Sequence, residues 1–166
     1  MSDSNPLWVQ RWFKKMVVEI VKHPDTRFEV IPKMLKEAFS ELDNGNFNAE
    51  IDLRFTNRLR KHIHEYAGHA RAAVLAKLLD KDKGDLVYWY ETFTEEYVKS
   101  KKCWKRKRSY SVKPEKINLE EYKNLLLRKL KDTLEIAGFN VNDLKQQEIS
   151  KHTAIIPISQ EVGISK

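Results

Sequence analysis

Residues 86–111 read LVYWYETFTEEYVKSKKCWKRKRSYS, an aromatic-rich half followed by a strongly basic half. Just before them, Gly84 and Asp85 are typical of a helix stop and of the N-cap of a new helix. The large side chains of the aromatic half recur at steps of three and four, at Leu86, Trp89, Tyr90, Phe93 and Tyr97. This spacing predicts a helix that begins at Asp85 and ends in the basic half.

Residues 99–116 concentrate the positive charge of the chain. They hold nine Lys or Arg residues and one Glu, a net charge of +8, while the whole chain carries +7, so everything else sums to −1. A near-neutral body with one positive segment is typical of a protein that binds a polyanion. Trp104 and Tyr110 lie in this segment, and aromatic rings among cations suit stacking on bases as well as neutralisation of phosphates.

We therefore expect this segment to bind nucleic acid. The candidate residues are Lys101, Lys102, Trp104, Lys105, Arg106, Lys107 and Arg108. Two plainer interpretations stay open, a solvated charged loop and a targeting tract, because a run of like charges often does no more than face solvent.

Two helices and then one longer helix are predicted N-terminal to this stretch. The Asn5–Pro6 pair is typical of a helix start and should open a helix that runs to about Lys22, and Pro32 should open the next one. Residues 49–80 contain no proline and carry a continuous apolar stripe at steps of three and four. They predict a single long helix of about 45 Å, at ~1.5 Å per residue.

A further helix is predicted from Asn118, where Glu121 completes a capping box, to Gly138. The fold class we expect is therefore all-α, a single-domain bundle of about five helices with one long central helix. Residues 1–140 should form the bundle. Residues 141–166 should form a C-terminal extension, with a short helix and an ordered tail that includes the segment TAIIPIS.

The predicted long helix would carry a second basic face. Arg54, Arg58 and Lys61 are four and three residues apart, so they would lie together on one side of it. Such a row of cations suits phosphate contacts that position a strand without reading its sequence. The alternative is a solvent-facing side with intrahelical salt bridges, for which Glu50 stands at four-residue spacing from Arg54.

The motifs that suggest catalysis or metal binding are incomplete. HIHEYAGH (62–69) looks like the zinc signature H-E-x-x-H, but His64 and His69 are five residues apart and would point about 140° apart on a helix. The sequence has no glycine-rich phosphate loop. Cys103 lacks the placed base and oxyanion site that a nucleophile needs. We therefore expect no enzyme activity, no metal and no cofactor.

The cellular location follows from cysteine usage and hydropathy. Cys103 is the only cysteine, which excludes an intramolecular disulfide and suits a reducing compartment. The N-terminal stretch lacks the charged-then-apolar order of a signal peptide, and the apolar runs are far shorter than the ~20 residues of a membrane span. We expect a cytoplasmic protein.

The segment LRFTNRLRKHIHEYAGHARAAVLAKLLDKDKGDLVYWYETF (53–93), with the basic tract after it, resembles the C-terminal helical part of the large subunit of type I-D CRISPR surveillance (Cascade) complexes. That part is similar to the family's separately produced small subunit. The resemblance implies a non-catalytic helical subunit, stacked in several copies, that holds the guide–target duplex and the displaced DNA strand by their backbones. Its basic groove would fall on Arg54, Arg58 and Lys61 and on the stretch from Lys101 through Arg108.

The partners implied by this resemblance are guide RNA, target DNA, other subunits of the complex and further copies of the chain. Two other functions stay open. A stand-alone nucleic-acid-binding regulator should form a symmetric dimer and prefer one duplex sequence. A helical scaffold whose basic run contacts acidic proteins, or is merely solvated, should show no salt-dependent affinity for DNA or RNA.

Overall fold

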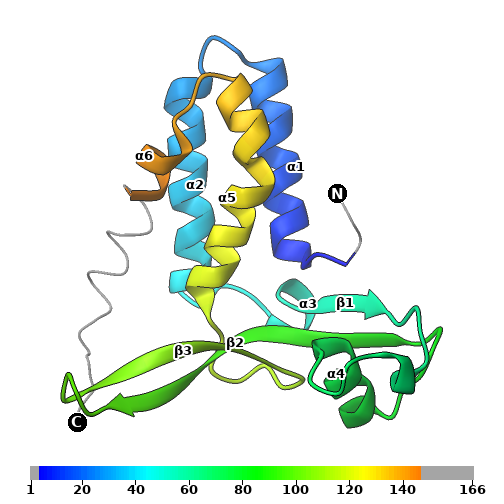
Figure 1. Cartoon of the computed structure of the whole chain (residues 1–166). Helices are drawn as coiled ribbons and strands as arrows, with labels where there is room; N and C mark the ends of the chain where they lie inside the picture. The colour runs from blue at the N-terminus through cyan, green and yellow to red at the C-terminus, as the bar shows by residue number, and fades with distance from the viewer. Residues whose placement is uncertain (1–3, 147–166) are drawn as a thin grey trace.

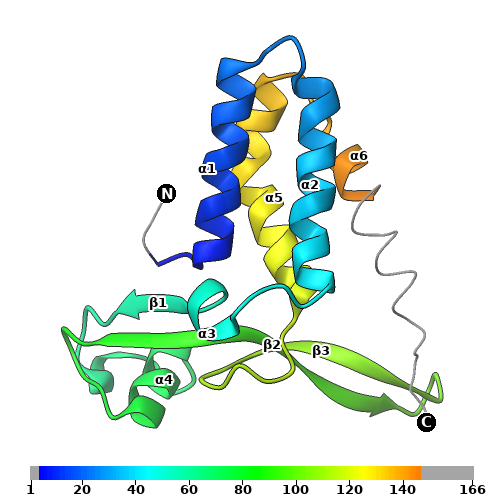
Figure 2. The same ribbon diagram turned by 180° about the vertical axis from the view of Figure 1, so that it is seen from behind.

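Three long helices stand side by side over a twisted antiparallel sheet in the computed structural model, which describes residues 4–146 (Figure 1, and from behind in Figure 2). The long helices are α1 (Leu7–Lys22), α2 (Arg27–Asp43) and α5 (Leu119–Ile136). The sheet has the order β1-β2-β3, with β1 (Phe55–Arg58), β2 (Leu86–Val98) and β3 (Cys103–Ser111). The smaller elements are α3 (Ala49–Asp52), η1 (Ile63–Glu65), α4 (Arg71–Leu79) and α6 (Val141–Lys145).

The prediction of an all-α fold is wrong, because two of the predicted helices contain the sheet. Residues 49–80 form α3, β1, η1 and α4 in succession instead of one long helix, and residues 86–111 form β2, a four-residue loop and β3. β2 is rich in Val, Thr, Tyr, Trp and Phe, which pack well on a pleated surface. Its first four residues pair with β1 and its other nine with β3, so every residue of β2 has a partner in one ladder.

The helices predicted from the Asn5–Pro6 pair and from Asn118 are confirmed. α1 begins at Leu7, one residue after the predicted position, with Pro6 at its N-cap. The side chain of Asn118 caps α5 by accepting the backbone N–H of Glu121 at 3.4 Å. Gly138 follows α5 with φ +98°, the left-handed conformation that ends a helix and that glycine adopts without steric cost.

The start of α2 differs from the prediction. This helix begins at Arg27, and Pro32 lies inside it instead of opening it. The backbone N–H groups of Glu29 and Val30 both bond to the carbonyl of Thr26, and these bonds form the first turn. A helix can therefore start well before a proline when earlier residues supply its first hydrogen bonds.

The hydrophobic core lies between the three long helices and continues onto the sheet. Trp8, Trp12 and Phe39 are among its largest fully buried side chains. Phe55 of β1 and Trp89 of β2, stacked with ring centroids 4.1 Å apart, extend the same core onto the sheet. Burial of such side chains stabilises a fold by about 1.5–3 kcal/mol each.

Tyr122 joins the bundle to the sheet. Its hydroxyl donates to the carbonyl of Leu53 at 2.6 Å and accepts the backbone N–H of Glu91 at 3.0 Å, so one buried side chain links α5 to β2 and to the chain just before β1. Burial raises the pKa of Tyr122. The neutral hydroxyl therefore keeps both hydrogen bonds across the ordinary pH range.

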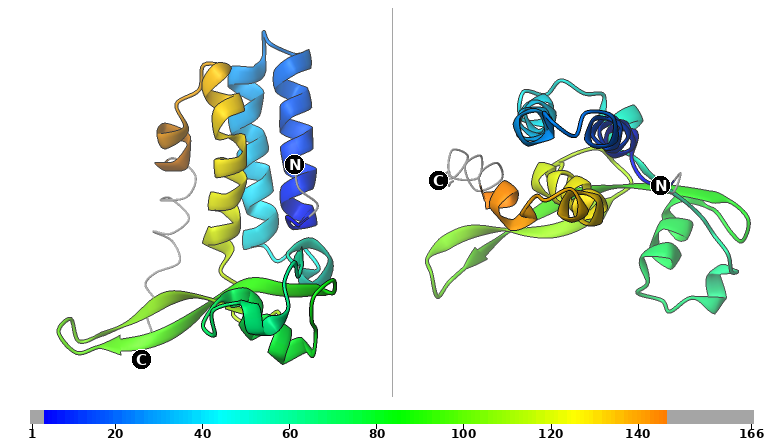
Figure 3. Two further views of the ribbon diagram at one scale, coloured as in Figure 1. Left: turned by 45° about the vertical axis from the view of Figure 1, so that its right-hand side comes forward. Right: turned by 90° about the horizontal axis from the view of Figure 1, so that it is seen from above.

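The two ends of the sheet lie on opposite sides of the bundle axis. Viewed from above, α4 and η1 lie beside one end of β2, and the β2–β3 hairpin extends beyond the bundle at the other end (Figure 3). Val141 and Leu144 of α6 pack onto the core. The predicted tail around TAIIPIS lies outside the described residues. Within residues 4–146, no helix combines the length and the apolar character that a membrane span requires.

Candidate nucleic-acid interface

The basic run forms one side of a projecting hairpin, which we call the basic arm and define as residues 91–111. It consists of the outer part of β2, the loop 99–102 and β3, and it extends away from the helices (Figure 1). Lys102 adopts a left-handed conformation in the loop, with φ 49°. Residues 101–108 are all exposed. The predicted candidates from Lys101 to Arg108 therefore lie together on one structure, although this structure is a β-ribbon and not the end of a helix.

The arm has two different faces, because side chains alternate along a strand and residues paired in register share a face. Tyr97 pairs with Trp104, Glu95 with Arg106 and Phe93 with Arg108. These six residues share one face, which we call the aromatic face. The opposite face carries Glu96 paired with Lys105 and Thr94 paired with Lys107, and we call it the lysine face.

Acidic residues of β2 lie directly opposite basic residues of β3. Glu95 and Glu96 face Arg106 and Lys105 in the ladder, and opposite charges in this position stabilise a strand pair modestly. They do not neutralise the arm. Residues 91–111 hold seven Lys or Arg and three Glu, so the arm keeps a net charge of +4.

Arg108 fastens the base of the arm to the body. Its Nε and Nη2 atoms donate to the two carboxylate oxygens of Glu91 at 3.1 and 2.7 Å, and Nε lies 3.7 Å from Glu121 of α5. These carboxylates raise the pKa of Arg108, and the hydrogen bond to Glu91 contributes most. Arg108 was predicted to bind nucleic acid, but the structure places it in an internal ion pair.

The connection from β3 to α5 also holds the base of the arm. The backbone N–H of Phe93 donates to the carbonyl of Lys116 at 3.0 Å, and the N–H of Asn118 donates to the carbonyl of Glu91 at 3.0 Å. Thr92 forms an isolated bridge with Ile117. The arm thus leaves the body from a braced position, and its outer half is free of the helices.

Arg54, Arg58 and Lys61 do not form the predicted helical face, because no helix covers them. Arg54 precedes β1 and places its guanidinium 5.2 Å from the ring centroid of Tyr88. Arg58 lies in β1 and donates to the carbonyl of Gly84 at 2.6 Å. Lys61 lies beyond β1, with its amine 5.4 Å from the ring centroid of Tyr66.

Arg58 is also remote from the outer part of the arm. Arg58 pairs with Leu86 at the start of β2, whereas Lys105 pairs with Glu96, ten residues further along the same strand. At ~3.3 Å per residue the two positions are about 33 Å apart. The structure therefore separates Arg58 from the outer cations of the arm. Arg54 lies nearer to the base of the arm, because its neighbour Phe55 pairs with Trp89.

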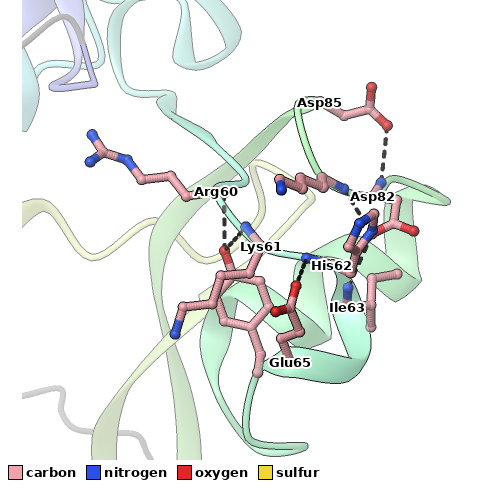
Figure 4. Close-up of polar contacts among 9 residues, drawn as sticks. Arg60, Lys61, His62, Ile63, Glu65, Asp82 and Asp85 are labelled. Carbon is pink, nitrogen blue, oxygen red and sulfur yellow. Dashed lines mark hydrogen bonds and ion pairs between the residues drawn. The ribbon is translucent and has the colours of Figure 1, made fainter.

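The histidine-rich motif belongs to a loop held by polar contacts (Figure 4). The backbone N–H of His62 donates to Glu65 at 2.9 Å, and the N–H of Ile63 donates to Asp82 at 3.0 Å. The His62 Nδ1 atom lies 3.5 Å from Asp82. The backbone N–H of His62 is the main cause that lowers the pKa of Glu65. The backbone N–H of Lys83, and after it that of Ile63, are the main causes that lower the pKa of Asp82.

The motif therefore has a structural explanation, although the helix assumed for it is absent. Among residues 4–146, no group of three or more His, Cys, Asp or Glu side chains is placed to hold a metal ion. Cys103 is exposed at the start of β3, where it pairs with Val98.

Comparison with known proteins identifies no relative: no protein-family model matches the chain, and no curated protein matches it.

The structure contradicts the all-α fold that the resemblance to type I-D CRISPR subunits implies. Residues 53–93, which carry the resemblance, contain β1, η1, α4 and the first half of β2 instead of continuous helix. Membership of a surveillance complex stays a prediction. Co-purification of the chain with other proteins and with RNA of uniform length would support it.

Sequence reasoning missed Phe93 and Tyr97 as parts of the candidate interface, and Glu91 as the partner of Arg108. A signal for them was present, because Glu96 and Lys105 are equally far from the loop 99–102, as are Tyr97 and Trp104. Matching charges and aromatic residues on both sides of a short loop indicate a hairpin.

Proposed function

We propose that this protein binds nucleic acid through the basic arm, by phosphate contacts that do not depend on base sequence. The observation that supports this function is the row of exposed Lys and Arg side chains on a narrow two-stranded ribbon that extends beyond the body (Figure 1). A two-stranded ribbon can enter a major groove or lie along a single strand. Phosphate contacts fix the position of a protein on nucleic acid and carry no sequence information.

The available charge sets the expected salt dependence. Besides the ion-paired Arg108, the arm carries six exposed cations: Lys99, Lys101, Lys102, Lys105, Arg106 and Lys107. If each neutralises one phosphate of a single strand, the plot of log affinity against log salt should have a slope of about −4, at roughly −0.7 per contact.

The test compares two variants with the same loss of charge. The arm variant replaces Lys99, Lys101, Lys105 and Lys107 with Gln. It leaves Lys102 unchanged, because that residue adopts the left-handed conformation. The control variant replaces four exposed lysines of the bundle with Gln: Lys33, Lys36, Lys129 and Lys131. Fluorescence anisotropy with labelled DNA and RNA of random sequence gives the affinity of each variant across a salt series.

We expect the arm variant to bind much more weakly and its slope to become less negative by about 3, while the control variant keeps the wild-type slope. Equal behaviour of the two variants would remove the arm as the binding surface. An affinity that does not change with salt would instead favour a protein scaffold. A marked preference for one duplex sequence would favour a stand-alone regulator.

A further inference from the structure

We infer that the aromatic face of the arm stacks on unpaired bases, so that the ligand of this protein is single-stranded nucleic acid rather than duplex. This inference rests on the proposed function and adds the substrate class to it. It also adds Tyr97, a residue of the acidic strand, to the binding surface. The argument comes from the register, the ring geometry and the exposure of the arm.

Tyr97 and Trp104 form an exposed aromatic pair near the end of the arm. They are directly opposite in the ladder, with ring centroids 5.6 Å apart and ring planes at 72°. An edge-to-face pair of this kind leaves ring faces uncovered by the partner. Tyr97 is 48% exposed and Trp104 is 54% exposed. The pair therefore offers flat aromatic surface to a ligand while each ring holds the other in place.

A stacked cation continues the same face toward the body. The guanidinium of Arg106 lies 4.1 Å from the ring centroid of Phe93. Arg106 is two residues from Trp104 along β3, about 7 Å at ~3.3 Å per residue, and both side chains lie on the aromatic face. A strand that stacks a base on Trp104 would thus find a positioned cation for its backbone at the neighbouring nucleotide.

The composition of the face favours single strands. Every base has a π-face, but in a duplex these faces are covered by neighbouring base pairs, and only base edges and phosphates remain accessible in the grooves. Phosphate contacts from the lysine face and the loop are available to both ligands. The aromatic pair gains a partner only when the bases are unpaired, so it should separate the two affinities.

The four tryptophans provide a direct readout. Trp8, Trp12 and Trp89 are buried, so among the tryptophans Trp104 is the one that a ligand can reach on the surface. Stacking of a base on Trp104 should quench the tryptophan fluorescence of the full chain. The probes are a fifteen-nucleotide oligothymidine and a DNA duplex with about the same number of phosphates. Trp104→Phe is the optical control, because it keeps an aromatic ring and removes the indole.

The affinity test uses the double variant Tyr97→Ile/Trp104→Ile, which keeps residues that favour strands and removes both aromatic rings. We expect quenching by oligothymidine in the wild type, little quenching in Trp104→Phe, and a loss of about tenfold in oligothymidine affinity in the double variant. Its affinity for the duplex should stay within about twofold of the wild type. A circular dichroism spectrum identical to wild type shows that the fold is intact.

Two outcomes overturn the inference and leave the proposed function standing: salt-dependent binding without quenching, and a double variant that loses single-strand and duplex affinity equally. Absence of binding to both probes at low salt overturns the proposed function itself. If the double variant loses the wild-type spectrum, the quenching comparison between wild type and Trp104→Phe decides alone.

Discussion

Arg108 makes a contact inside the molecule that the sequence did not indicate. Its side chain is 56% exposed, and it binds the carboxylate of Glu91, whose side chain is 6% exposed. We expect Arg108→Gln to lower the free energy of unfolding by about 2 kcal/mol. The buried carboxylate of Glu91 loses its charged hydrogen-bond partner, and water replaces that partner only incompletely.

Urea denaturation measures this loss, and Lys107→Gln is the matched control, since Lys107 is a neighbouring exposed cation on the opposite face. The control should change stability by less than about 0.5 kcal/mol. The double variant Glu91→Gln/Arg108→Gln should lose less than the sum of the two single losses. If the losses add, the pair is not coupled and the structural role assigned to Arg108 is wrong.

Lys123 predicts an unequal effect of removing the two partners of one ion pair. Its side chain is 1% exposed, and its amine lies 2.7 Å from a carboxylate oxygen of Asp43, whose side chain is 20% exposed. Asp43→Ala leaves a buried ammonium without this partner and should cost about 3 kcal/mol. Lys123→Met keeps an unbranched side chain of similar length and leaves a carboxylate that water can reach, so it should cost clearly less.

Thermal or urea unfolding of the two variants gives the comparison. An equal loss, or a larger loss for Lys123→Met, would show that the ammonium is not held as a buried charge. A third variant, Asp43→Asn, separates charge from hydrogen bonding at the same position.

At the scale of elements, the loop that contains the histidine motif should respond to acid. The pKa values of Glu65 and Asp82 are lowered in the folded state, so their contribution to the loop is complete above the ordinary carboxyl pKa of about 4 and is lost as the pH falls through the lowered values. We expect the amide resonances of His62, Ile63 and Lys83 to shift during this titration, because these groups donate to the two carboxylates.

Nuclear magnetic resonance spectra recorded from pH 7 to pH 2.5 test this expectation. A midpoint below 4.5 at the His62 amide, which reports on Glu65, and midpoints below 3.8 at the Ile63 and Lys83 amides, which report on Asp82, agree with it. Midpoints at or above the ordinary carboxyl pKa would show that the hydrogen bonds do not favour the ionised forms. The amide of Glu121, which donates to the neutral amide oxygen of Asn118, is the internal reference.

The helices could be predicted from the sequence, and the strands could not, for a physical reason. α1 and α5 carry an apolar stripe on one face, and capping residues mark their ends. In β2 the residues from Trp89 to Thr92 are buried on both faces, so the strand shows no alternation. The loop after it contains no Gly, Pro or Asn, and Lys102 takes the left-handed conformation that Gly or Asn more often adopts. The two usual signs of a hairpin are therefore missing, and the match of charged and aromatic residues across the loop is the remaining signal.

The candidate site could be predicted only where its residues are adjacent in the sequence. The cations from Lys101 to Arg108 adjoin one another in sequence, so any local structure brings them together. The grouping of Arg54, Arg58 and Lys61 depended on a helical period and failed when that segment paired with β2. Tyr97 enters the site only through its register with Trp104, a relation between strands that no single-strand pattern contains.

At the scale of the whole molecule, we expect the body to keep its fold when the outer arm is removed. Replacing residues 95–106 with Asn-Gly would join Thr94 to Lys107, a directly paired position, through a two-residue hairpin turn. A two-stranded ribbon outside the body is marginally stable in isolation, so its removal should change the free energy of unfolding by about 1 kcal/mol or less. Nucleic-acid affinity should fall at least as far as in the four-lysine arm variant.

Circular dichroism and urea denaturation test the body, and anisotropy tests binding. A shortened chain that binds as well as the wild type would place the interface elsewhere on the molecule. A shortened chain that no longer unfolds cooperatively would show that the arm is part of the folding unit.

The position of α5 in the chain affects how the protein folds. α5 completes the bundle by packing on α1, yet about 100 residues separate the two helices, and the whole sheet lies between them in sequence. The chain between them forms a long loop, and closing it costs more conformational entropy than forming a local hairpin. We therefore expect this contact to form after the β2–β3 ribbon. During synthesis α1 and α2 leave the ribosome with one apolar side uncovered until α5 emerges, an interval of roughly 5–20 s at 5–20 residues per second. The nascent chain is therefore most prone to aggregation over this interval, when chaperones would bind the α1–α2 pair.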